Sequence, residues 1–281
     1  IEKFPFSSGG NATDVGNLTR NTSEYAAGNS SDTHGYTAGG TNSISNIIDK
    51  FPFSSDDNAT DVGDLLAVAY SLAAASSETH GYAAGGFTSP SSTPVNTIQK
   101  YTFSVDANAT DVGDLSYFSY RYVMGNQSEN TGYVMNTGYP LAGYPFGYLE
   151  KYPFASDDNG TIISSSGLTN SLRIGVSAQS SADHGYFSGG QVSGSPSTKV
   201  DIIEKFPFSN EANAADVGNL IGALGWCSGT MSVDDGYVTG GQPPPPARSN
   251  VIQKYPFASD ANSTDVGDMQ SARSSPTNQE V

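Results

Sequence analysis

Hydrophobic residues in this chain fall into short runs of about five to ten residues, separated by clusters of Gly, Ser, Asn and Asp. The second unit shows the pattern best, with runs at residues 46–53, 59–65, 66–75 and 80–86. Short runs bounded by turn residues predict β-strands. Residues 66–75 have helix-forming composition, but the equivalent stretches 172–177 and 221–228 are rich in Gly and Ser, so we predict strand there as well.

One of these runs ends in Lys-Phe-Pro-Phe or a near copy, and it returns six times, with lysines at Lys3, Lys50, Lys100, Lys151, Lys205 and Lys254. The spacing of about fifty residues indicates copies of one supersecondary unit that pack on each other. The units begin near residues 1, 48, 98, 149, 203 and 252. Four strands in each such repeat are typical of a β-propeller.

We therefore predict an all-β fold in which residues 1–281 form a single β-propeller domain of four-stranded antiparallel blades. Six blades fit the repeat number best, with five or seven as alternatives. Strands from both termini are expected to close the ring, because closure removes exposed sheet edges. Specifically, residues 3–18 should pair with a strand from the tail, residues 270–281.

A second phrase, Gly-Tyr-x-x-Gly-Gly, recurs at residues 35–40, 81–86, 185–190 and 236–241, and unit three departs from it at 132–136. An aromatic residue followed by a glycine doublet resembles the end of the second strand in kelch-type propeller repeats. The phrases Phe-Pro-Phe-x-x-Asp-x-Asn-Ala-Thr-Asp-Val-Gly-Asp-Leu and Thr-His-Gly-Tyr-x-x-Gly-Gly are also similar to repeats of virion-associated structural proteins of marine tailed phages. That resemblance implies a virion appendage or capsid-decorating role.

The strand order assigns the connections to two faces. We expect the turns after Phe-Pro-Phe, which are similar from unit to unit and rich in Asp and Asn, on one face. Connections after the glycine doublet vary in length and composition and belong on the other face. Variable loops on a rigid scaffold often carry binding specificity. The connection with the most aromatic residues, 137–147, contains Tyr139, Tyr144 and Phe146. We predict that these three side chains bind a partner; the alternative is that they fill space in the core.

The acidic turns place oxygen-bearing side chains at alternate positions, as a hard cation such as Ca²⁺ requires. Three turns carry the full set: Asp56, Asn58, Thr60 and Asp64; Asp106, Asn108, Thr110 and Asp114; Asp260, Asn262, Thr264 and Asp268. Turns closed by Asp, Asn, Ser and Thr side chains explain the same residues without a metal. We expect no cofactor, with calcium as the alternative.

Both aromatics of each Phe-Pro-Phe phrase should pack between adjacent blades, because residues two apart on a strand face the same side. The prediction covers Phe4, Phe6, Phe51, Phe53, Phe206 and Phe208. We expect Phe53→Ala to cost about 3–5 kcal/mol as truncation of a buried aromatic.

Charge and chemistry narrow the function. The 28 acidic and 12 basic residues give a net charge of −16, which argues against nucleic-acid binding and against adhesion to anionic membranes. The longest apolar run is too short to span a bilayer. His34, His80 and His184 share one repeat position, but other residues break any ring of imidazoles, and the single cysteine, Cys227, is expected to be a buried small hydrophobe.

The sequence predicts a non-catalytic structural or recognition module with a protein or glycan partner, located in the virion or outside the cell and not spanning a membrane. The partner is a host-surface molecule or a neighbouring protein. Two alternatives stay open: a calcium-dependent carbohydrate-binding propeller and a kelch-like oxidase. The oligomeric state is not determined by the sequence.

Overall fold

The computed structural model describes residues 1–20, 25–41, 45–118, 123–136, 147–164, 168, 173–192, 198–244, 247–275 and 277. The described residues form 28 strands in eight sheets and contain no helix. The all-β prediction is therefore confirmed, and residues 66–75 contain strands, as predicted.

Five of the sheets have four antiparallel strands in the same order, and we number them sheets 1 to 5 along the chain. Sheet 1 comprises β3 (Ala27–Ser30), β4 (His34–Ala38), β5 (Ile47–Pro52) and β6 (Thr60–Asp64). Sheet 2 comprises β8 (Ala73–Ser76), β9 (His80–Ala84), β12 (Thr97–Thr102) and β13 (Thr110–Asp114). Sheet 3 comprises β14 (Val123–Ser128), β15 (Thr131–Asn136), β16 (Tyr148–Pro153) and β17 (Thr161–Ser164). Sheet 4 comprises β19 (Ser177–Ser180), β20 (His184–Ser188), β23 (Ile202–Pro207) and β24 (Ala215–Asn219), and sheet 5 comprises β25 (Ser228–Met231), β26 (Asp235–Thr239), β27 (Val251–Pro256) and β28 (Thr264–Asp268).

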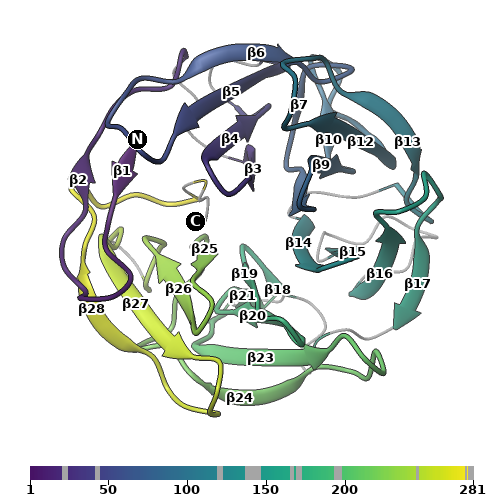
Figure 1. The fold of residues 1–281 in the computed structure, drawn as a ribbon. Helices are drawn as coiled ribbons and strands as arrows, with labels where there is room; N and C mark the ends of the chain where they lie inside the picture. The colour runs from purple at the N-terminus through teal and green to yellow at the C-terminus, as the bar shows by residue number, and fades with distance from the viewer. Residues whose placement is uncertain are drawn as a thin grey trace.

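Figure 1 shows these sheets set side by side around a common centre, with β3, β14, β19 and β25 innermost and β6, β13, β17, β24 and β28 at the rim. Neighbouring inner strands contact each other in sequence order, from β3 through β8, β14 and β19 to β25. Buried residues therefore gather between successive sheets, in separate clusters, rather than in one central core.

The glycines of the Gly-Tyr phrase are needed for this packing. Gly185 on β20 lies opposite Phe206 on β23, and a Cβ at Gly185 would come within 2.2 Å of the Phe206 ring. The following doublet ends the strand with positive φ, as at Gly39 (68°) and Gly40 (108°), a conformation that glycine adopts without strain. The sequence phrase thus encodes both the ring packing and the strand end.

Two smaller sheets confirm that the connections after the glycine doublet share a face with those leading to the inner strands. The hairpin of β10 (Phe87–Thr88) and β11 (Thr93–Pro94) pairs with β7 (Ala69–Tyr70), which precedes the inner strand of sheet 2. The hairpin of β21 (Gln191–Val192) and β22 (Thr198–Lys199) pairs with β18 (Arg173–Ile174) in the same way.

The aromatic pairs pack between neighbouring sheets in five of six cases. In each, the tyrosine of a Gly-Tyr phrase stacks on the second aromatic of the next unit, with centroid distances of 4.6–4.7 Å: Tyr36 on Phe103, Tyr82 on Phe154, Tyr133 on Phe208, Tyr186 on Phe257 and Tyr237 on Phe6. The prediction is confirmed for Phe4, Phe6, Phe206 and Phe208.

Phe51 and Phe53 differ from the other pairs in one respect: Phe51 is buried, as predicted, but the tyrosine stack on the second ring is missing. Their rings lie 6.1 Å apart, edge to face, but no tyrosine stacks on them in the described part of the chain. Phe53 is half-buried, as are its counterparts Phe6, Phe103, Phe154, Phe208 and Phe257. The expected cost of Phe53→Ala is accordingly below that of a fully buried aromatic.

The N-terminal sheet has two strands, β1 (Glu2–Lys3) and β2 (Thr13–Asp14), and lies between sheet 5 and sheet 1 (Figure 1). Residues 270–275 and 277 of the tail form no strand, so the predicted strand pairing of residues 3–18 with the tail is not found there. The Glu2 side chain makes the contact instead: it accepts hydrogen bonds from the backbone amide of Gln270 at 3.1 Å and from the Arg273 side chain at 2.6 Å.

Candidate functional site

The aromatic loop that we predict to bind a partner lies outside the described residues, as do its three anchors Tyr139, Tyr144 and Phe146. Its ends are described. β15 finishes at Asn136, whose side-chain amide donates a 2.9 Å hydrogen bond to the Tyr148 hydroxyl at the start of β16. Tyr148 itself is buried, and burial raises its pKa. The two strand ends that flank the loop are therefore joined by a side-chain hydrogen bond.

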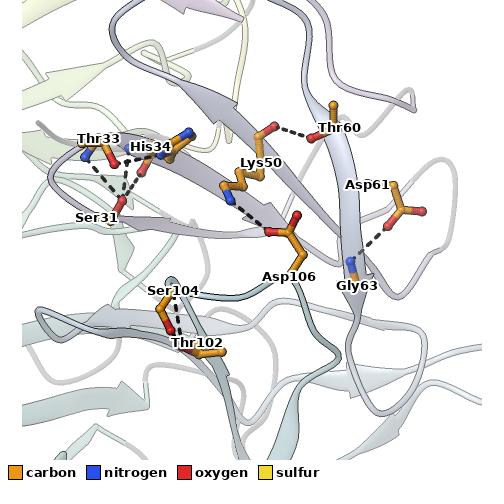
Figure 2. Close-up of polar contacts among 10 residues, drawn as sticks. All are labelled: Ser31, Thr33, His34, Lys50, Thr60, Asp61, Gly63, Thr102, Ser104 and Asp106. Carbon is orange, nitrogen blue, oxygen red and sulfur yellow. Dashed lines mark hydrogen bonds and ion pairs between the residues drawn. The ribbon is translucent and has the colours of Figure 1, made fainter.

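The carboxylates of the acidic turns form ion pairs with lysines from the preceding sheet. Lys50 on β5 contacts Asp106 at 2.9 Å, as Figure 2 shows. The same pairing recurs between successive units: Lys3 with Asp56 and Lys100 with Asp157, both at 2.5 Å, Lys151 with Glu211, and Lys205 with Asp260. Lys254 differs, because the N-terminal unit has Gly9 at the position where the other turns carry the carboxylate. Lys254 instead contacts Asp235 of its own sheet at 3.2 Å.

The turn asparagines bind the backbone of the preceding sheet. The Asn108 side-chain oxygen accepts from the Asp64 amide at 3.0 Å, and the Ala109 amide donates to the Asp64 carbonyl at 2.8 Å. Equivalent side-chain contacts join Asn58 to Asn17, Asn159 to Asp114, Asn262 to Asn219 and Asn11 to Asp268. These turns therefore connect one sheet to the next.

The remaining turn residues close their own hairpins. Asp61 accepts from the Gly63 amide at 3.2 Å, a two-residue Asx turn that Asp14, Asp111, Asp216 and Asp265 repeat (Figure 2). The hydroxyls of Thr60, Thr110 and Thr264 donate to the lysine carbonyls of the neighbouring strand at 3.4–3.5 Å.

Three of the four predicted calcium positions thus take part in other contacts through their side chains. The fourth position, at Asp64, Asp114 and Asp268, uses its backbone amide. Within the described ranges, no three His, Cys, Asp or Glu side chains gather as a metal site would require. Calcium coordination by Asn, Thr and carbonyl oxygens together with these carboxylates stays a prediction.

The residue before the Phe-Pro-Phe lysine is a buried polar group in five of the six units, and in the first unit Glu2 is half-buried. Gln99 accepts from the Leu66 amide, Glu150 from the Ser116 amide, and Gln253 from the Ile221 amide, each at 2.8 Å. Glu204 pairs instead with buried Arg173, and Asp49 with Arg20 at 3.4 Å and with Thr19. Desolvation raises the pKa of both Glu150 and Asp49.

Glu150 stands apart in this series. It is fully buried, one of its oxygens has no hydrogen-bond partner, and no cation forms an ion pair with it in the described part of the chain. Perturbed carboxylates mark functional sites in many proteins. Here Gln occupies two equivalent positions, which indicates that hydrogen bonding to the preceding sheet, and not charge, is the shared role.

The histidines and the cysteine have local contacts. His34 hydrogen-bonds through Nδ1 to the hydroxyl of the preceding Thr33 at 2.8 Å (Figure 2), and His80 bonds Thr79 in the same way. Desolvation lowers the pKa of both histidines. Cys227 is buried among Leu220, Leu224 and Val238, and burial raises the pKa of its thiol to about 11. A thiol in this surrounding is poorly suited to nucleophilic chemistry.

Among the hollows of the molecule, one lies at the centre and another beside β1. The central one, of about 160 Å³, is lined by inner-strand residues such as Gly28, Gly125 and Gly229. The larger, of about 650 Å³, lies beside β1, and its walls include Phe4, Phe51 and Phe53. We call the second the β1 groove. Sequence reasoning did not identify it, although one signal was present: six aromatic pairs are matched by five Gly-Tyr phrases.

No family model matches the chain, and no curated protein matches it. In the described residues, no helix has the length and apolar character needed to cross a membrane.

Proposed function

We propose that the chain forms a six-bladed β-propeller that acts as a non-catalytic recognition module. The contacts of the N-terminal sheet carry this proposal. The Asn11 side chain accepts from the Asp268 amide and the Ala12 amide donates to the Asp268 carbonyl, as at the junction of sheets 1 and 2. On the other side, the Asn17 amide donates to the Asn58 side chain, and the Asn17 carbonyl accepts from the Ala59 amide. A two-stranded unit that bonds on both sides like a full sheet is the expected sixth member of a ring.

The distribution of polar groups supports recognition rather than catalysis. On the face of the acidic turns, the carboxylates of successive units are engaged in ion pairs and turn closure. The opposite face carries connections that differ in every unit, including the added hairpins β10–β11 and β21–β22. Loops that vary on a repeated scaffold are suited to selective binding.

The partner proposed is a glycan or protein, bound through Tyr139, Tyr144 and Phe146. Aromatic side chains give large contact area at low entropic cost. The resemblance of the repeats to those of phage virion proteins directs the proposal to a virion appendage or capsid-decorating role, with a host-surface molecule or neighbouring virion protein as partner.

The test is the double variant Tyr144→Ser/Phe146→Ser, compared with the wild type in binding to a glycan array and to purified virions lacking this protein. We expect binding to fall at least tenfold while Tm changes by less than about 2 °C, since loop aromatics outside the core contribute little to stability. A matched control is Phe87→Ser, in the buried part of another connection, which should lower Tm. Unchanged binding by the double variant contradicts the proposed site.

The ring itself has a separate test. Electron microscopy of the purified chain should show six radial units about one centre. Five or seven units, or an open array, contradict the propeller proposal.

A further inference from the structure

The β1 groove could accept an additional β-strand, because β1, which lines it, is hydrogen-bonded to another strand on one side only. β1 pairs with β2, and in the described residues no strand lies on its other side. The equivalent strands β5, β12, β16, β23 and β27 each pair on that side with the strand that carries Gly-Tyr. An unpaired edge is a template for another strand.

The backbone of the N-terminal unit shows an unused donor at the matching position. In the five complete sheets, the amide of the second aromatic donates to the carbonyl three residues before the tyrosine at 2.8–3.0 Å: Phe53 to Thr33, Phe103 to Thr79, Phe154 to Asn130, Phe208 to Asp183 and Phe257 to Asp234. The Phe6 amide has no such acceptor in the described part of the chain.

The side chains show the same gap. Phe4 is half-buried, whereas its counterparts Phe51, Tyr101, Tyr152, Phe206 and Tyr255 are buried, each beneath a glycine of the adjacent strand. Phe53 has no stacked tyrosine, whereas its five counterparts have one. Both rings line the groove.

We propose that the β1 groove binds an extended strand of a partner polypeptide that carries glycine followed by tyrosine. The strand lies antiparallel to β1. Its glycine covers the Phe4 ring, its tyrosine stacks on Phe53, and the carbonyl three residues before the tyrosine accepts from the Phe6 amide. Binding of this kind takes affinity from main-chain hydrogen bonds and specificity from side-chain pockets. The 650 Å³ of the groove lies within the range of about 300–1,000 Å³ of binding pockets.

This site is separate from the aromatic loop of the proposed function, so each can fail alone. The probe is a peptide with the sequence of residues 77–88 of this chain, which contains His-Gly-Tyr-Ala-Ala-Gly-Gly. It is added to the full chain, and amide hydrogen exchange at Phe6 and peptide affinity are measured. We expect exchange at Phe6 to slow at least tenfold at saturation.

Two matched peptides test the chemistry. Gly81→Val places a side chain where the Phe4 ring lies, and Tyr82→Ser removes the stacking ring; each should weaken binding at least tenfold. Phe53→Ser in the protein should also weaken peptide binding at least tenfold. Phe103→Ser is the control and should leave the affinity unchanged, because Tyr36 of the chain itself already stacks on Phe103.

Because a free peptide binds weakly, a second arm joins residues 77–88 to the C-terminus through a flexible linker, which raises the effective concentration to millimolar. This fusion should raise Tm, and the Gly81→Val fusion should not. Equal Tm values for the two fusions, or equal affinities for the three peptides, overturn the proposal. The proposal is also overturned if the chain self-associates and the peptide does not reverse this self-association. The occupant of the groove is then a second copy of the chain that does not use a Gly-Tyr strand.

Discussion

Sheet 5 and the N-terminal sheet contain nearly the same outer strands but differ in what lies inside them. β27 runs through Gln-Lys-Tyr-Pro and the N-terminal unit through Glu-Lys-Phe-Pro. In sheet 5, Gln253 and Tyr255 are buried beneath β26. In the N-terminal sheet, Glu2 keeps 16% of its side chain exposed and Phe4 is half-buried.

The difference between these two sheets shows that the turn hydrogen bonds and the aromatic packing have separate roles. Hydrogen bonds between the acidic turns position a unit against its neighbours, and they form equally well with two strands or four. Burial of the aromatic ring depends on the strand that carries glycine and tyrosine. Position and burial are therefore encoded in different halves of the repeat.

The strongest test of this separation compares Phe206→Ala with Phe4→Ala. Phe206 is fully buried and packs against Tyr133 and Phe187, so its truncation should cost about 3–5 kcal/mol. Phe4, at the equivalent position, should cost about 1 kcal/mol, as a partly exposed side chain. Denaturant unfolding of both variants measures the difference. Equal losses show that the N-terminal unit is as tightly packed as sheet 4.

A second test exchanges charge at one repeat position. Glu150→Gln should raise the free energy of unfolding at pH 7 by about 1–3 kcal/mol, because it removes a buried charge without a cation and keeps the acceptor for the Ser116 amide. The raised pKa of Glu150 means that its contribution to stability is present below the ordinary glutamate pKa and is lost as pH rises through the raised value.

The gain from Glu150→Gln should therefore grow between about pH 4 and pH 7 and vanish in acid. Glu2→Gln is the control: it removes the ion pair with Arg273 while keeping an acceptor oxygen, and it should cost less than about 1 kcal/mol. Thermal unfolding as a function of pH measures both. A destabilised Glu150→Gln protein contradicts the role assigned to this position.

A smaller effect is expected from the lysines. Lys3 and Asp56 are both more than half exposed, so Lys3→Ala should change stability by less than about 0.5 kcal/mol and less still in high salt. Lys100 is 19% exposed, and Lys100→Ala should cost more than Lys3→Ala. The reverse order would mean that the N-terminal unit depends on its ion pair more than a complete sheet does.

The smallest effect is expected from calcium. Adding Ca²⁺ after treatment with a chelator should leave Tm within about 1 °C, because the Asp, Asn and Thr side chains of the turns already have protein partners. The matched variant is Asp106→Asn. A Ca²⁺-dependent rise in Tm that disappears in this variant establishes the calcium site and supports the carbohydrate-binding alternative.

Sequence reasoning predicted the strands, their order and their faces well, because local pattern decides them. Gly35 and Tyr36 mark one strand and Phe51 its neighbour, and the structure pairs them as expected. It did not predict that Phe53 lacks a stacked tyrosine, because that contact depends on a strand from a different unit. The tail was likewise assigned a strand from its position in the repeat, but its contact is with the Glu2 side chain.

The sequence by itself determined the repeat, the four-strand unit, the tight turns at Asp61 and its counterparts, and the glycines beneath the aromatic rings. These features depend on residues close in the chain or one hairpin apart. Only the tertiary structure decided that Asp106 pairs with Lys50 of the preceding sheet, and that the N-terminal unit leaves an open strand edge among the described residues. Both depend on which unit lies next in space, and a repeated sequence presents the same residues whether or not a neighbour covers them.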